Sequence, residues 1–359
     1  MSRVPFDPKE LDSEEIWPGL MGRPGVKKFN TPITPKENVH LYYNRKEALW
    51  MPMSGDRVGI TPRIDPDNMA RAFAFEANSI TPEEMVGGKD KFGVEWVYVP
   101  IAFGSMVKPG NPTLTDVNDW KSVIPFPDVD SWDWEGSKAS NAELVGGGRG
   151  VTVTILTGFF ERLISFMDFE NAALALIDDD QKDAIHELFD ALADVYIKMI
   201  AKFKYAYGID VLSFHDDWGS QRAPFFGLAT VREMILPALK RIGDYCRANG
   251  VILDMHSCGK NELLVPAYIE AGCHSWGGQP INDRMMLFEK YGDQIILSIE
   301  PDITFTPETT DQEAVAAANR WLDKFGPTLA AKPVNCGGMP NNIAFLETLY
   351  EGTRKILCG

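Results

Sequence analysis

The fold is decided by residues 208–256, where GIDVLSF (208–214) and GVILDMH (250–256) flank the stretch VREMILPALKRIGDYCRANG (231–250). The two short runs are mostly apolar, which is typical of strands buried on both faces of a parallel sheet. The stretch between them has apolar residues at helical spacing and ends at Gly250, as helices commonly do. The segment therefore predicts a strand, a helix and a second, parallel strand.

The same alternation recurs on both sides of this unit. Residues 181–204 and 310–326 also have helical periodicity, and the second of these opens with Thr310 and Glu313 at capping-box spacing. Six further strand-like runs are ALWMPMS (48–54), GVEWVYVPIAF (93–103), VTVTILTGF (151–159), CHSWGG (273–278), QIILSIE (294–300) and KPVNCG (332–337). Eight strands alternating with helices predict an α/β protein with a (β/α)8, or TIM, barrel.

This reading sets the expected domain organisation. Residues 1–45 are rich in Pro, Gly and charge and predict an N-terminal arm, and residues 46–359 predict the catalytic barrel. Residues 104–150 interrupt the alternation and predict a long insertion after the second strand. A doubly wound open sheet is the structural alternative, and it is disfavoured because no Gly-rich phosphate loop follows the first strand.

Composition narrows the function classes. The 359 residues include 35 Lys and Arg against 51 Asp and Glu, a formal charge of −16, which disfavours binding to nucleic acid and to anionic membranes. No apolar run approaches about 18 residues, and the N-terminus lacks the apolar core of a signal peptide. Five cysteines in so long a chain do not suggest a disulfide framework. We therefore expect a soluble, cytoplasmic enzyme.

Chemistry-bearing residues follow the predicted strands. In a (β/α)8 barrel the carboxyl ends of the strands converge on one mouth, where active sites lie. The fourth to eighth runs lead there to His215-Asp216-Asp217-Trp218, His256-Ser257-Cys258, Gln279, Glu300 and Cys336. One His and two Cys that meet in space are typical zinc ligands, and three protein ligands with an open fourth position are typical of catalytic zinc. The alternative is that the cysteines are small buried apolar residues.

The residues near these candidate ligands each have a structural and a functional interpretation. One of Asp216 and Asp217 is expected to cap the helix that follows its strand, and the other to face the pocket. Glu161 is expected to pair with Arg162 or another neighbour. His215, Asp217 and Glu300 are candidate catalytic residues that could deliver a proton. Gln279 is a candidate substrate-binding residue. Aromatic side chains could form an apolar wall of the substrate pocket, although they could instead belong to the hydrophobic core. They are Trp96, Phe103, Phe159, Trp218 and Trp276.

Six segments resemble the uroporphyrinogen decarboxylase superfamily, and specifically its corrinoid-dependent zinc methyltransferase branch. They are PDNMARAF (66–73), GFFERLISFMDFEN (158–171), HDDWGSQ (215–221), HSCGK (256–260), GGQPINDRMMLFEKYGD (277–293) and VNCGG (334–338). The resemblance spans about residue 48 to the C-terminus and implies a (β/α)8 barrel. It also implies zinc held by His256, Cys258 and Cys336.

Two departures from the family patterns bear on activity. The arginine-bearing RQAGR motif with which the decarboxylases bind porphyrin carboxylates is missing, so porphyrin decarboxylation is not expected. The glutamate of the methylcobamide:coenzyme M branch is replaced at Gln279-Pro280, which leaves Glu300 or water as the fourth zinc ligand. The GGQPIND variant is more similar to the O-demethylase methyltransferases I.

The resemblance therefore implies transfer of a methyl group from a methyl ether, typically a methoxylated aromatic, to the Co(I) corrinoid, or cobalamin, of a partner protein. Three alternatives stay open. They are transfer from a methyl-corrinoid protein to a thiol, a metal-free decarboxylase-type lyase, and a non-catalytic barrel that binds a partner. The sequence also leaves open whether the N-terminal arm closes over the site or joins two protomers in a homodimer.

Overall fold

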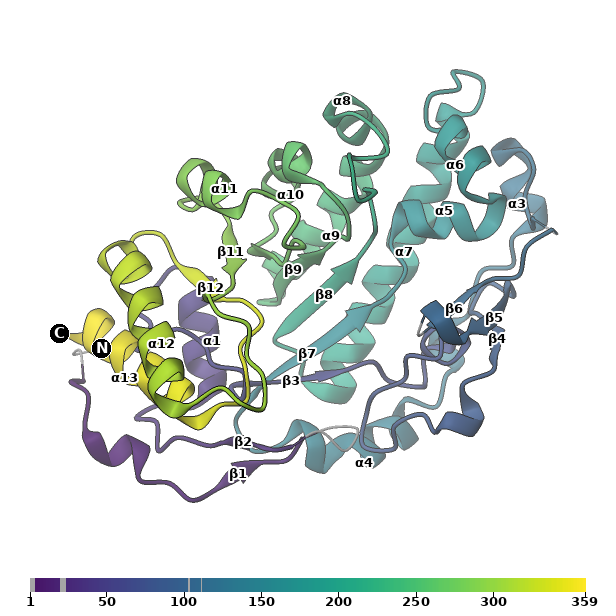
Figure 1. Ribbon diagram of the computed structural model, residues 1–359. Coiled ribbons are helices and arrows are strands. Elements are labelled where there is room, and N and C mark those ends of the chain that lie inside the picture. Colours follow the sequence, from purple (N-terminus) through teal and green to yellow (C-terminus); the bar gives the residue numbers. More distant parts are fainter. Residues whose placement is uncertain (1–3, 20–23, 103, 111) are drawn as a thin grey trace.

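The centre of the computed structural model is a curled sheet of seven parallel strands, with helices along its outer side (Figure 1). The structure describes residues 4–19, 24–102, 104–110 and 112–359. In spatial order the strands are β12 (Val334–Cys336), β11 (Ile296–Ile299), β10 (Ser275–Trp276), β9 (Ile252–His256), β8 (Val211–His215), β7 (Gly150–Ile155) and β3 (Arg57–Ile60). This arrangement confirms the predicted α/β class with a TIM-barrel-like fold.

The helices behave as their sequences predict. The longest, α7 (Lys182–Tyr207), buries an apolar stripe and ends at Gly208, whose φ of 64° is favourable for glycine. Thr310 and Glu313 form the predicted capping box of α12 (Asp311–Phe325). The other helices of the barrel are α5 (Phe159–Met167), α6 (Phe169–Ala175), α8 (Leu228–Thr230), α9 (Leu236–Ala248), α10 (Val265–Glu270), α11 (Arg284–Tyr291) and α13 (Ile343–Cys358). No helix in the described ranges is both long enough and apolar enough to cross a membrane.

Two predicted strands lie elsewhere. Residues 48–54 are irregular and contain Pro52, which has no N–H to donate to a strand ladder, and the first parallel strand is β3. The run 93–103 instead forms β5 (Glu95–Val99), the middle strand of a small antiparallel sheet between β4 (Gly87–Lys89) and β6 (Gly104–Val107). The expectation of eight barrel strands was therefore wrong for these two runs, and the described residues contain seven.

The insertion is longer than predicted and follows the first parallel strand rather than the second. It occupies residues 61–149, between β3 and β7, and carries the small sheet. Its helices are α2 (Pro66–Ala70), α3 (Trp120–Val123) and α4 (Trp134–Val145). The change follows from assigning the run 93–103 to this segment.

A buried ion network anchors the insertion to helix α5. The guanidinium of Arg162 forms ion pairs with Asp67 and with Asp90, whose Oδ2 lies 2.5 Å from Nη1. Lys91 Nζ lies 2.7 Å from Asp67 Oδ2 and 2.9 Å from Asp65 Oδ1. All five side chains are at most 1% exposed. Charges this deeply buried are stable only when they are paired.

The sheet is open between β3 and β12, its two end strands, and the N-terminal segment packs across this seam. This segment contains a hairpin of β1 (Ile16–Trp17) with β2 (Val26–Lys27), followed by α1 (Pro35–Tyr43). Tyr42 donates its hydroxyl proton to the Val334 carbonyl at 2.7 Å and accepts the Val334 N–H at 3.0 Å. Tyr43 contacts both strands, because its ring faces Arg57 and its hydroxyl accepts a bond from Asn335.

We expect Tyr42→Phe to destabilise the protein. The substitution leaves the buried N–H and C=O of Val334 without the hydroxyl, which costs about 1–3 kcal/mol. A thermal melt should therefore show a midpoint a few degrees lower than that of the parent. Tyr245→Phe on α9 is the control, because no hydrogen bond involves the Tyr245 hydroxyl in the described part of the chain. Equal midpoints for the two variants would contradict a role of Tyr42 at the seam.

Candidate metal centre

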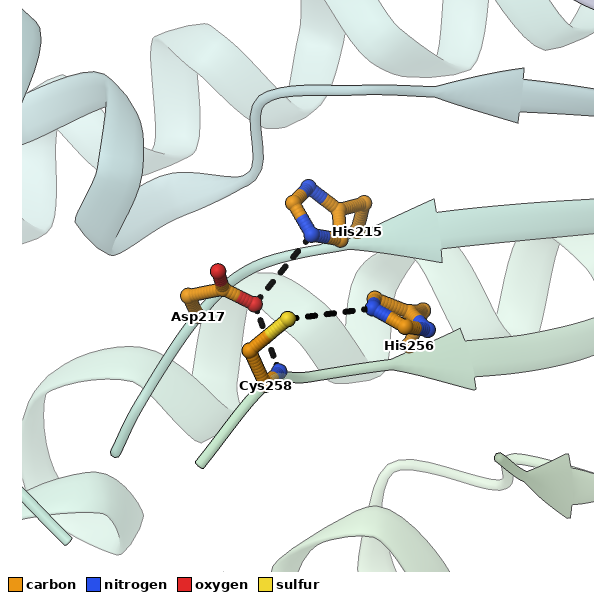
Figure 2. Close-up of side chains that lie close together, drawn as sticks. All are labelled: His215, Asp217, His256 and Cys258. Carbon is orange, nitrogen blue, oxygen red and sulfur yellow. Dashed lines mark hydrogen bonds and ion pairs between the residues drawn. The ribbon is translucent and has the colours of Figure 1, made fainter. Parts of the chain in front are cut away.

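Four potential metal ligands meet where two adjacent strands end (Figure 2). His215 and His256 are the last residues of β8 and β9 and are partners in the strand register. Their rings stack with centroids 4.8 Å apart. Asp217 and Cys258 lie two residues beyond them, and the four ligand atoms all lie within 4.8 Å of one another. The parallel pairing of β8 and β9 therefore builds the cluster.

Direct contacts connect the four side chains. Nε2 of His215 lies 3.1 Å from Asp217 Oδ1, and the same oxygen accepts the backbone N–H of Cys258 at 2.6 Å. The Sγ of Cys258 lies 3.4 Å from Nε2 of His256. Both contacts of Asp217 use one oxygen, so this carboxylate holds the turn after β9 against the turn after β8. Asp217 therefore belongs to the cluster, although it lines neither of the cavities described below.

The charge states in the cluster follow from burial and from neighbouring charges. Burial lowers the pKa of His215, but Glu161 and Asp217 outweigh it and hold the pKa well above its usual range. Burial raises the pKa of Asp217, but the hydrogen bond and charge of His215 bring it to about 2. Burial and the charge of His215 lower the pKa of His256. His256 is thus favoured as a neutral imidazole, the form that binds metals.

Asp216, the other aspartate, caps a helix. Its carboxylate accepts the backbone N–H groups of Phe160 at 3.1 Å and Glu161 at 2.9 Å, in the first turn of α5. This helix follows the neighbouring strand β7 rather than β8. Burial and the nearby Glu161 charge raise the pKa of Asp216 to about 7. The expectation that one aspartate caps the following helix was therefore wrong, because α5 precedes Asp216 in the chain and α8, the helix that follows, has no side-chain cap.

Glu161 and Arg71 belong to the site, although sequence reasoning gave neither of them a role there. Glu161 Oε2 lies 3.0 Å from Nδ1 of His215, and its Oε1 lies 3.5 Å from Nη1 of Arg71. Arg71 also donates to the Leu156 carbonyl at 2.6 Å and to the Thr157 hydroxyl at 2.9 Å. Both residues lie in segments that carry the family resemblance, 66–73 and 158–171, which is the signal that could have singled them out.

Two adjoining cavities lie beside the cluster. The first has a volume of about 430 Å³, and its lining includes His215, His256 and Arg71. The second has a volume of about 560 Å³, and its lining includes Arg57, Asp254 and Glu300. Thr154 and Ser213 line both, so the two cavities are neighbours. A small molecule could therefore reach from the cluster into the interior of the sheet.

Cys336 and Glu300 line the second cavity and are outside the four-residue cluster. Strands β10 and β11 separate β12, which carries Cys336, from β9. Three strand spacings of about 4.8 Å amount to about 14 Å along the sheet, although the curl shortens the direct path. Burial raises the pKa of the Cys336 thiol to about 12. Glu300 forms an ion pair with Arg284. The structure thus unites His256 and Cys258 with His215 and Asp217, and not with Cys336.

The proposed substrate-binding residues have other neighbours. Trp218 stacks on Tyr268, and Phe159 packs against Phe189, Tyr196 and Phe214; both are fully buried and line neither cavity. Trp276 is likewise buried, and Phe103 lies outside the described residues.

Trp96 and Gln279 contact residues that surround the cluster rather than the cluster itself. Trp96 lies under the guanidinium of Arg71, 5.3 Å from its ring centroid, and donates its indole N–H to Asp90. Gln279 accepts the backbone N–H of Gly259 at 2.9 Å and so supports the turn that carries Cys258. Substrate binding by the aromatic side chains and by the Gln279 amide therefore stays a prediction.

The donor set fits a zinc ion. Two imidazoles, a thiol and a carboxylate are all zinc ligands, and tetrahedral bonds of about 2.0–2.3 Å place ligand atoms roughly 3.3–3.7 Å apart. The separations of 3.1 Å and 3.4 Å within the cluster are close to that range. In addition, Nδ1 of His215 lies 2.7 Å from the Leu156 carbonyl and 3.0 Å from Glu161. A metal-binding histidine is typically oriented in this way, with Nε2 directed at the ion.

Comparison with known proteins gives a likeness in fold. No family model and no curated protein matches this chain. Its structure is similar to that of a methyltransferase from Methanosarcina mazei, with a TM-score of 0.54 and 14% identity over 89% of this chain and 98% of that chain.

Two other solved structures match more weakly. A dihydropteroate synthase from Burkholderia cenocepacia matches with a TM-score of 0.26 and 17% identity over 40% of this chain and 50% of its own. A sugar phosphate isomerase/epimerase from Parabacteroides distasonis matches with a TM-score of 0.28 and 10% identity over 65% and 77%. Only the first likeness is close enough to show a shared fold.

Proposed function

We propose that this protein is a zinc-dependent methyltransferase. It moves a methyl group from a methyl ether, a methoxylated aromatic compound, to the Co(I) corrinoid of a partner protein. The observation that carries the proposal is the cluster of His215, Asp217, His256 and Cys258 beside a cavity at the carboxyl ends of the strands. The fold shared with a methyltransferase and the sequence resemblance described above agree with it.

In this proposal the zinc ligands are Nε2 of His215, Nε2 of His256 and Sγ of Cys258, with Asp217 beside them. This set retains two of the three ligands expected from the sequence and assigns Cys336 to the wall of the second cavity. His215 becomes a ligand rather than a proton donor: zinc would displace the proton on Nε2, while Glu161 and the Leu156 carbonyl hold the proton on Nδ1. Zinc bound there would act as a Lewis acid that stabilises the negative charge on the departing ether oxygen.

The chain itself contributes positioning and a defined set of charges. Asp217 holds the turn of Cys258 through its backbone N–H, and Asp216 fixes the start of α5, which carries Glu161. The first cavity has polar walls at Thr154 and Ser213 and an apolar side at Leu156. A ring held against these walls would present its methoxy group at the mouth. Such positioning is a large part of catalysis when a separate acceptor must approach in line.

The test of the proposal is methyl transfer in both directions. We expect the purified protein to convert a Co(I) corrinoid protein to the methyl-Co(III) form when a methoxyarene is present, and to release the matching phenol. The absorbance change of the corrinoid and chromatography of the phenol measure this. Transfer from a methyl-Co(III) protein to a thiol, without any reaction of methoxyarenes, would instead support the reverse reaction. Absence of transfer in both directions would overturn the proposal.

A further inference from the structure

The interior of the sheet is unusually polar for a barrel. In (β/α)8 barrels the inward positions mostly carry bulky branched apolar side chains that fill the core. Here small or polar side chains from five strands line the second cavity; they are Thr152, Thr154, Ser213, Asp254, Ser298 and Asn335. They leave about 560 Å³ open. A cavity with convergent polar groups beside a reactive centre is the usual form of a ligand site.

Arg57 stands out among the arginines of the two cavities. Arg71 forms an ion pair with Glu161, and Arg284 forms one with Glu300. Arg57 lines the second cavity and is half-buried, yet its side chain makes no ion pair or hydrogen bond with any of the described residues. Its guanidinium lies over the ring of Tyr43, 5.4 Å from the centroid. An arginine in such a place has all its hydrogen-bond donors available to a ligand.

Other polar atoms of this cavity also lack partners. The hydroxyl of Thr152 and Oδ1 of Asn335 are buried, and neither has a hydrogen-bond partner within the described ranges. Asn335 is held in place by the bond from its Nδ2 to the Tyr43 hydroxyl at 3.0 Å. Buried polar atoms in proteins are nearly always satisfied by protein, water or ligand. The unpaired atoms of Thr152 and Asn335 thus indicate that a polar molecule binds in this part of the cavity.

We propose that the second cavity binds the carboxylate of a small aromatic acid, with Arg57 as its counterion. The planar guanidinium matches a carboxylate with two parallel hydrogen bonds. The ring of the acid would extend past Thr154 and Ser213 towards His215. The identification of this acid as the methyl donor, an anionic methoxyarene, rests on the proposed function, whereas the binding site itself does not.

The strand register gives the distance that a ligand between Arg57 and His215 has to span. Arg57 pairs with Gly150, and Ile155 pairs with Phe214, so Arg57 lies six residues below the level of His215. At about 3.3 Å per residue this is about 20 Å along the strands. The long arginine side chain covers part of that distance, and a substituted benzoate is suited to the rest. A one-carbon or two-carbon acid would reach only one end.

The charge of Asp254 selects against more highly charged anions. Asp254 lines the same cavity, and its Oδ1 accepts the Ser275 hydroxyl at 2.5 Å. Its negative charge attracts Arg57 but repels any anion bound there. Since Arg284 is paired with Glu300, Arg57 is the arginine available to a ligand, and Asp254 beside it suits a singly charged ligand better than a phosphate dianion. The same repulsion predicts that Asp254→Asn strengthens binding of the acid.

The test compares an acid with its neutral analogue by calorimetry. We expect 4-methoxybenzoate to bind the parent protein at least about tenfold more tightly than 4-methoxybenzamide, since a charge-assisted pair is lost with the amide. Arg57→Gln should remove this preference, and Asp254→Asn should increase it. Arg232→Gln, which removes a surface arginine paired with Glu270, is the matched control and should keep the preference. Arg57→Lys retains the positive charge but cannot form two parallel hydrogen bonds, so its preference for the acid over the amide should be intermediate.

The possible outcomes separate the two proposals. Equal affinity of the parent and Arg57→Gln for the acid, or no measurable binding of the acid to the parent, would overturn the carboxylate site. If the acid binds through Arg57 but no methyl group reaches a corrinoid, the site stands and the proposed function fails. If 4-methoxybenzoate is demethylated equally well by the parent and by Arg57→Gln, the function stands and the site fails. Thermal melts of every variant identify any loss of binding that is due to unfolding.

Discussion

Replacing Cys258 with alanine is expected to lower bound zinc from about one ion per chain to less than about a tenth of that amount. The thiolate of Cys258 is the only sulfur ligand in the cluster, and a metal site that loses one of its few protein ligands binds far more weakly. Methylation of the corrinoid should fall with the metal. Plasma mass spectrometry of protein purified without chelators measures the zinc content.

Cys336→Ala is the informative comparison for this experiment. Because Cys336 lies outside the cluster, we expect this variant to keep its zinc. Cys246→Ala, a buried position on α9, controls for the loss of a thiol as such. Loss of zinc in Cys336→Ala as well would favour the set His256, Cys258 and Cys336 expected from the resemblance. A parent protein without zinc would remove the metal mechanism and favour the metal-free lyase.

Arg162→Met should have the largest effect on stability. The substitution leaves Asp67 and Asp90 buried, with Lys91 as the remaining cation near Asp67. Burial raises the pKa of Asp67, but Arg162 and Lys91 bring it to about 2, so the group is ionised in the parent protein. Removing one partner of a buried ion pair typically costs about 3–5 kcal/mol, because a charge stays behind without compensation.

Urea unfolding followed by circular dichroism measures this loss. The control is Arg241→Met, which removes an exposed arginine paired with Asp190 and Asp194 and should cost at most about 1 kcal/mol. The buried network also attaches the insertion that carries Arg71 to the helix that carries Glu161. A folded Arg162→Met variant should therefore lose activity as well as stability. Similar unfolding midpoints for the two variants would contradict the stabilising role of the network.

Most of the fold could be predicted from the sequence because its strands and helices alternate with clear signals. The exceptions have physical causes. The strand Arg57–Ile60 contains an arginine and a glycine, since it lines a polar cavity, and so lacks the apolar signature of a buried strand. The run 93–103 is apolar, but Glu95 and Val97 are exposed while Trp96 is buried, the alternation of a one-sided antiparallel sheet.

Sequence patterns also place only some of the site residues correctly. The sequence indicates that strand ends share one edge of the sheet, so His215, Asp217, His256 and Cys258 could all be placed there. It does not indicate how far apart two ends lie along that edge. Neighbouring strands bring His215 to His256, whereas two further strands separate Cys336 from them. The pairing of Glu161 with Arg71 depends on where the insertion packs, which local patterns do not encode.

The contact of Tyr42 with Val334 has a consequence for how the molecule is made. The two residues are 292 positions apart in the chain, yet their hydrogen bonds join helix α1 to the last strand at the open side of the sheet. During synthesis α1 leaves the ribosome long before β12 exists, so its buried face has no partner for most of that time. Contacts between such distant segments form slowly, and unfinished chains expose apolar surface. Completion of the sheet is therefore expected to be a late event, with early chains depending on chaperones.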